Sequence, residues 1–142
     1  MEIKIVIDND TIASYRSYYF ETYPTRKKFP IKSPIPPSLN QWMVMRRFEM
    51  NHQKQVWKDF GMWLVRENNL QDKKIEKCSI TMEYFFPDKR RRDADNYTPK
   101  NLFDSFTASG LLVDDDFIHL ESLTIKGYYS KGHPKTVITI KY

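Results

Sequence analysis

An alternating run of apolar and polar residues from about Lys77 to Phe86 constrains the fold of this chain more than any other feature. Alternation of period two places one set of side chains on one face of a β-strand, and Pro87 ends the pattern because proline lacks a backbone donor. A strand with one apolar face must pack that face against other elements. The apolar set consists of Cys78, Ile80, Met82, Tyr84 and Phe86.

Two stretches have the spacing of amphipathic helices and can supply that layer. The first runs from about Arg47 to Asn68, and the second from about Asn96 to Ser109. Gly110 is a suitable residue for the end of the second helix, whereas Pro99 is tolerated only in its first turn. Their apolar stripes contain Val56, Phe60, Trp63 and Leu64 in one and Leu102, Phe103 and Phe106 in the other.

Three further segments are predicted to be strands, at residues 2 to 8, about 117 to 129 and 135 to 141, and the last two are joined by a turn at 130 to 134. The elements do not alternate regularly between strand and helix. The sequence therefore predicts a single compact α+β domain with a mixed sheet, two main helices and a C-terminal β-hairpin.

Residues 9 to 38 show no clear period. Five of the eight prolines fall here together with several cations, so we expect a Pro-rich, basic, extended connector. It is either a surface loop or an arm that follows a phosphate backbone.

Composition narrows the functional class. The 142 residues carry a formal charge of +5, which favours an acidic partner such as nucleic acid or an anionic membrane surface. Cys78 is the only cysteine, so neither a disulfide framework nor a thiolate zinc site is available, and a reducing cytoplasm fits. No segment approaches the roughly 20 apolar residues of a membrane span, so no membrane partner is expected.

The acidic residues form two clusters with possible metal chemistry. Asp93 and Asp95 are two positions apart, and in an extended segment both side chains would lie on one side. One or two of Asp114, Asp115 and Asp116 could reach the same point, and three carboxylates suit Mg²⁺ or Mn²⁺. The alternative is structural, because aspartates often cap helices or form solvated turns.

Cationic and polar residues adjoin the first acidic cluster. Lys89, Arg90, Arg91 and Arg92 could hold a polyanion, or could form an ordinary solvated loop. Lys100, one turn into the predicted helix, could neutralise a phosphate oxygen, and Asn96 could cap the helix or hold a carboxylate in place. A metal-dependent phosphodiesterase is thus one hypothesis among several.

Other chemistries are less well supported. The three histidines lack metal-binding spacing, and Cys78 lies on the apolar face of a predicted strand. No Gly-rich phosphate loop occurs, so a nucleotide cofactor is not expected.

Four segments, in this order and spacing, resemble the RusA family of Holliday-junction resolvases. They are Pro36-Pro37-Ser38-Leu39-Asn40, Pro87 to Asn96 with its Asp93-Ala94-Asp95-Asn96 motif, Phe103 to Gly110, and Val113-Asp114-Asp115. The resemblance extends from about Pro36 to the C-terminus.

The resemblance implies a homodimeric, Mg²⁺-dependent endonuclease that binds four-way DNA junctions in the cytoplasm, at the nucleoid, and nicks two opposed strands. Its catalytic and metal-binding aspartates fall on Asp93, Asp95 and Asp115, so Asp114 becomes a neighbour of the site. Its lysine corresponds to Lys100 when counted back from Asp104, although Lys100 is one position further from Asp95 than the family pattern has it.

The chain departs from the family by about thirty inserted residues after the first strand. This insertion leaves two other hypotheses open. One is a protein that binds branched DNA without cutting it, and the other is a metal-dependent nuclease that acts on flaps or RNA.

Overall fold

Four strands form one mixed sheet in the order β1-β4-β2-β3 in the computed structural model, which describes residues 1–142. The strands are β1 (Glu2–Ile7), β2 (Cys78–Phe86), β3 (Leu120–Tyr129) and β4 (Lys135–Lys141). The helices are α1 (Asn9–Thr22), α2 (Leu39–Met43), α3 (Arg47–Glu67) and α4 (Lys100–Ala108), with a 3-10 turn, η1 (Ala94–Asn96). The predicted single α+β domain with a mixed sheet is confirmed.

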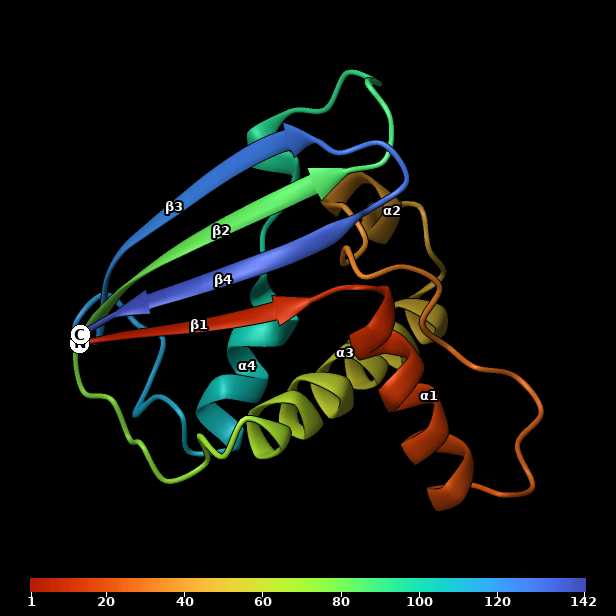
Figure 1. The fold of residues 1–142 in the computed structure, drawn as a ribbon, viewed down its shortest axis with the longest axis horizontal. Coiled ribbons are helices and arrows are strands. Elements are labelled where there is room, and N and C mark those ends of the chain that lie inside the picture. The colour runs from red at the N-terminus through yellow and green to blue at the C-terminus, as the bar shows by residue number, and fades with distance from the viewer.

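The predicted C-terminal hairpin is wrong, because β2 lies between β3 and β4 (Figure 1). β4 is antiparallel to both β1 and β2, whereas β3 is parallel to β2 through a crossover that contains α4. Burial explains the order: five consecutive residues of β4 are buried, and most of β3 is exposed. An interior position therefore suits β4 and an edge position suits β3.

The core lies between the sheet and the helices on one of its faces. The alternating set of β2 packs there with Ile5, Ile7, Ile138 and Ile140. α3 and α4 pack closely, since a Cβ added at Gly61 would overlap the side chain of Ser105. The apolar stripes predicted for the two helices are buried here.

Residues 9 to 22 form helix α1, so the prediction of an extended connector is wrong for this part. Asp8 and Thr11 form a capping box at its start, and the prolines begin only after its end. The ring of Tyr15 lies 5.0 Å from the rings of both Phe60 and Trp63, measured between centroids. Aromatic burial against α3 thus stabilises a helix whose periodicity is weak.

The rest of the predicted connector is irregular but attached to the domain. Ile31 is buried, and the hydroxyl of Thr136 donates a hydrogen bond to the carbonyl of Pro34 at 2.8 Å. The side chain of Ser38 then caps α2. These contacts fix the approach of the chain to α2, while Lys27, Lys28 and Lys32 stay exposed.

The end of α4 is a Schellman motif, as the glycine at position 110 predicted. Gly110 has φ +85°, and the N–H of Leu111 donates to the carbonyl of Phe106 at 3.0 Å. A Cβ at Gly110 would overlap the carbonyl oxygen of Gln71. This reversal directs the chain toward the acidic turn that precedes β3.

Candidate functional site

Arg92 of the basic run has a structural role. Its side chain is only 20% exposed, and Nη2 lies 2.9 Å from Oδ1 of Asp88. The guanidinium carbon lies 4.3 Å from the ring centroid of Phe86, and Nη1 donates to the carbonyls of Asp88 and Arg90. The backbone N–H of Arg90 and then the guanidinium of Arg92 hold the pKa of Asp88 below its ordinary value.

Lys89, Arg90 and Arg91 differ from Arg92 because they are exposed. The side chains of Arg90 and Arg91 are 83% and 90% exposed. Lys89 Nζ lies 5.0 Å from the ring centroid of Tyr129 at the end of β3. Three cations and an aromatic edge therefore face solvent beyond the end of β2, where a polyanion can approach.

Asp93 and Asp95 do not share an extended segment. Asp93 has extended backbone angles, but Asp95 lies within η1. The extended segment on which the same-side prediction depends is therefore absent, because the chain turns into a 3-10 helix between the two aspartates.

Neither aspartate acts as a helix cap. Asp93 precedes η1 without a capping hydrogen bond from its side chain, and α4 also begins without one. Asp93 Oδ1 lies 3.4 Å from Nη2 of Arg91, and the Asp93 side chain is 64% exposed. The side chain of Asp95 is exposed and makes no hydrogen bond or ion pair. The capping alternative therefore does not account for these carboxylates.

Asn96 joins two segments that are far apart in sequence. Its Oδ1 accepts a hydrogen bond from the backbone N–H of Asn40 at 2.9 Å. The Pro-Pro-Ser-Leu-Asn segment and the Asp-Ala-Asp-Asn segment are consequently neighbours. Asn96 positions η1 through this bond and does not cap α4.

Lys100 is the first residue of α4, one turn earlier in the helix than predicted. The helix begins late because the residue before Pro99 is disfavoured in helical conformation. Lys100 Nζ lies 3.8 Å from Oδ2 of Asp104, and its side chain is 72% exposed. The helix thus carries a cation and a carboxylate on the same face.

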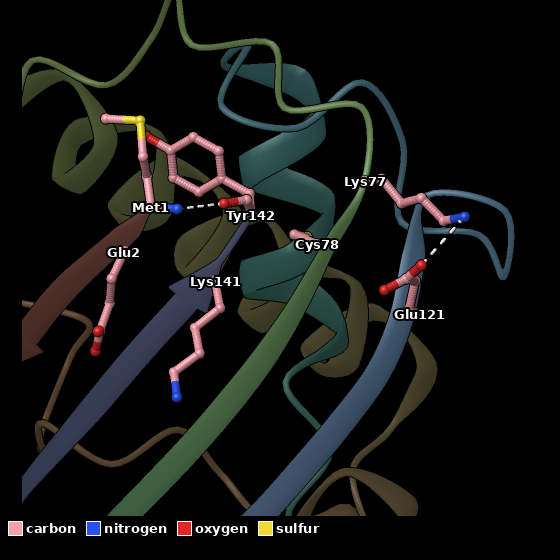
Figure 2. A pocket seen from close by; sticks show the side chains of 7 residues that line it. All are labelled: Met1, Glu2, Lys77, Cys78, Glu121, Lys141 and Tyr142. Carbon is pink, nitrogen blue, oxygen red and sulfur yellow. Dashed lines mark hydrogen bonds and ion pairs between the residues drawn. The ribbon is translucent and has the colours of Figure 1, made fainter.

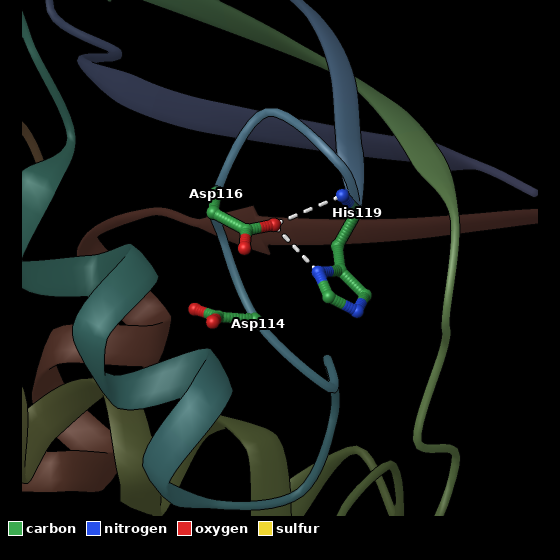
Figure 3. Close-up of side chains that lie close together, drawn as sticks. All are labelled: Asp114, Asp116 and His119. Carbon is green, nitrogen blue, oxygen red and sulfur yellow. Dashed lines mark hydrogen bonds and ion pairs between the residues drawn. The ribbon is translucent and has the colours of Figure 1, made fainter.

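The turn between α4 and β3 contains an Asp–His group (Figure 3). Oδ1 of Asp116 accepts from the backbone N–H of Ile118 and of His119 and lies 2.5 Å from Nδ1 of His119. The side chain of His119 is the largest cause of a lowered pKa at Asp116. Asp116 therefore stabilises the turn.

Asp115 has the opposite electrostatic environment. Partial burial is the largest cause of its raised pKa, and the carboxylates of Asp114 and Asp104 add to it. Asp114 also accepts a hydrogen bond from the backbone N–H of Asp115 at 2.7 Å. Three carboxylates thus act on one another, and one of them, Asp104, is paired with Lys100.

One set of three potential metal ligands has its ligand atoms within 4.8 Å of one another, namely Asp114, Asp116 and His119. Asp93, Asp95 and Asp115 do not form such a set within the single chain. Asp93 lies beside the later half of β3, at Ile125 to Gly127, whereas the acidic turn precedes the first residue of β3. The two clusters therefore lie toward opposite ends of this strand (Figure 1).

Two residues of this neighbourhood were not among the sequence predictions of metal ligands. His119 has no second histidine at metal-binding spacing. Its only sequence signal is Asp116, three positions earlier in a segment that forms a turn. Asp104 lies on α4 one turn after Lys100. In the sequence, Asp104 is only the reference position that aligns Lys100 with the lysine of the family pattern.

A surface hollow of about 670 Å³ lies elsewhere, where the chain ends meet (Figure 2). Lys77 Nζ pairs with Oε1 of Glu121 at 3.1 Å, and the N-terminal amine donates to the carbonyl of Tyr142. Charges of both signs line this hollow and neutralise one another. It offers neither a cluster of carboxylates nor a basic surface, so its size does not make it the functional site.

A scan against protein-family models and a search of curated proteins gave no match. None of the helices is both long and apolar enough to cross a membrane.

Proposed function

We propose that this protein is a Mg²⁺-dependent, structure-specific endonuclease of the RusA type that resolves four-way DNA junctions by paired, symmetric nicks. The observation that carries the proposal is the crowding of Asp104 and Asp114 around Asp115, whose pKa is raised first by partial burial and then by these two carboxylates. Carboxylates that repel one another are suited to binding a divalent ion.

The metal ligands in this proposal are Asp93, Asp95 and Asp115, with Asp114 beside them. Their oxygen donors fit Mg²⁺, with Mn²⁺ as a substitute. A bound ion would lower the pKa of a water molecule and stabilise charge on the scissile phosphate. Lys100 would neutralise a phosphate oxygen, and its pairing with Asp104 keeps it near the acidic turn.

DNA would approach across the basic loop. Lys89, Arg90 and Arg91 are exposed and would contact phosphates, while Arg92 would support the loop that presents them. Such contacts position the substrate without reading its sequence. A DNA substrate also implies a cytoplasmic location, at the nucleoid.

A homodimer would serve this function in two ways. Paired nicks in a two-fold symmetric junction require two active sites. A second copy could also bring its Asp93 and Asp95 to Asp115 of the first chain, since these residues do not form a set within one chain. Sedimentation analysis tests the dimer, and a monomer at working concentration would exclude this arrangement.

The decisive experiment incubates the protein with labelled four-way junctions, flaps, duplexes and RNA in Mg²⁺, Mn²⁺ or EDTA. We expect paired nicks in junctions with either metal and none in EDTA. Asp72→Asn, on the exposed turn after α3, is a matched control that should cut normally. Preferential cleavage of flaps or RNA would redirect the proposal to another substrate.

A second function is favoured by the separation of the two acidic clusters. A protein that binds branched DNA without cutting it needs only the exposed cations and not the shared metal site. Junction binding in gel-shift assays, together with intact junctions at protein excess over a range of metals and pH, would support it.

A further inference from the structure

A small aromatic cavity lies directly beside Asp93. It has a volume of about 210 Å³ and lies between η1 and β3. Its lining includes Phe86, Tyr97, Arg92 and Gly127. The cavity is smaller than a typical pocket for a drug-sized ligand and suits a single planar group.

Gly127 keeps the cavity open. It pairs in register with the buried Tyr84 on the helix-covered face of the sheet. A Cβ at this position would lie 3.3 Å from Cε2 of Phe86, and a larger side chain would fill the space above that ring. The absence of a side chain thus leaves an aromatic surface accessible.

The aromatic walls are arranged as a stacking surface. The ring centroids of Phe86 and Tyr97 are 5.1 Å apart, the ring planes are inclined at 61°, and both residues are half-buried. The guanidinium of Arg92 lies over the Phe86 ring, and Arg92 also lines the cavity. Aromatic rings and arginine planes are the groups on which unpaired bases stack.

A second hollow of about 320 Å³ continues from the cavity and provides positive charge. The two share Phe86, Arg92 and Gly127, and the second is also lined by Lys89 and Arg90. One site for a base and one for its flanking phosphate are therefore contiguous. Asp93, 64% exposed, lies at the edge of this combined surface.

We infer that this surface binds one unstacked nucleotide of the DNA, with its base against Phe86 and Tyr97 and its phosphate on Lys89 and Arg90. This inference rests on the proposed function, because it places an unpaired nucleotide of the branch point next to the cleavage site. A duplex cannot enter so small a cavity, whereas strands at a branch point can release a base.

The test measures binding of short thymidine oligonucleotides and of matched abasic oligonucleotides with the same number of phosphates, in Ca²⁺. We expect the thymidine strand to bind at least about fivefold more tightly, as one stacked base provides. Gly127→Val should remove this preference. Thr124→Val, on the opposite face of β3, should retain it.

Equal binding of the two oligonucleotides by the unchanged protein would overturn the inference, and so would a preserved preference in Gly127→Val. Gly127→Ala, with circular dichroism as the check of folding, provides a milder variant. The measurement is independent of cleavage. A base preference without junction cutting would therefore remove the nuclease proposal alone, and cutting without a base preference would remove only this inference.

Discussion

Asp88 in the basic loop around η1 and Asp115 in the acidic turn before β3 have opposite electrostatic environments. Asp88 lies among a backbone donor and two arginines, which lower its pKa. Asp115 lies among other carboxylates and is partly desolvated, which raises its pKa. The comparison indicates that the basic loop neutralises Asp88 internally, while the carboxylates around Asp115 leave an excess of negative charge that a cation could relieve.

The largest expected effect is on the rate of cleavage, and it tests whether each of the two regions contributes to catalysis. Asp93→Asn and Asp115→Asn should each lower junction cutting by about a thousandfold or more, since losing a metal ligand removes several kcal/mol of transition-state stabilisation. Single-turnover assays with labelled junctions measure this. Full activity in either variant would mean that its region is not catalytic.

Mixing the two inactive variants sharpens the result. If each active site combines Asp93 of one chain with Asp115 of the other, a mixed dimer contains one intact site and should make single nicks. If each site lies within one chain, the mixture stays inactive. Subunit exchange is confirmed beforehand by sedimentation of differently labelled chains.

The next effect concerns the turn that carries the acidic cluster. Gly110→Ala should destabilise the fold by about 2 kcal/mol or more, because alanine is strained at positive φ and its Cβ meets the carbonyl of Gln71. Thermal unfolding followed by circular dichroism measures this. Gly132→Ala also has positive φ but no neighbour within 4 Å, so it isolates the backbone strain and should cost less.

Much of the fold could be predicted from local periodicity. Strong patterns gave α3, β2 and β4 within a residue of their observed bounds, and Gly110 marked the end of α4. α1 was missed because its helical stripe consists of tyrosines, whose burial against Phe60 and Trp63 depends on tertiary packing. The pairing of β3 was missed because strand neighbours far apart in sequence leave no local signal.

The candidate site was less predictable than the fold. Residue types identified the charged clusters, but the 3-10 conformation at Asp95 and the contact between Asn96 and Asn40 depend on long-range packing. The same limit applies to the cavity at Gly127, which a glycine within a strand indicates only weakly. The residue types of each cluster could be read from the sequence, and the fold determined which clusters are neighbours.

A smaller effect distinguishes two adjacent arginines in the basic loop. Arg92→Ala should lower the free energy of unfolding by about 1 kcal/mol, because it removes the contact with Phe86 and a partly exposed ion pair. Arg91→Ala should change stability by less than about 0.5 kcal/mol and instead reduce the salt dependence of junction binding. Urea unfolding and binding titrations measure the two quantities. Equal stability of both variants would contradict the structural role of Arg92.

The smallest expected effect tests the excess negative charge directly. Because the pKa of Asp115 is higher in the folded chain than in the unfolded chain, the folded state holds more protons between these two values, so stability falls as pH rises through that window. Asp115→Asn should therefore raise the Tm of the metal-free protein by about 1 to 3 °C at pH 7, with no difference below about pH 3. Asp72→Asn serves as the exposed control.

Saturating Mg²⁺ should stabilise the unchanged protein more than Asp115→Asn, since the variant lacks the ligand. A lower Tm for Asp115→Asn in EDTA at pH 7 would show that the carboxylates are not in conflict, and the contrast with Asp88 would fail.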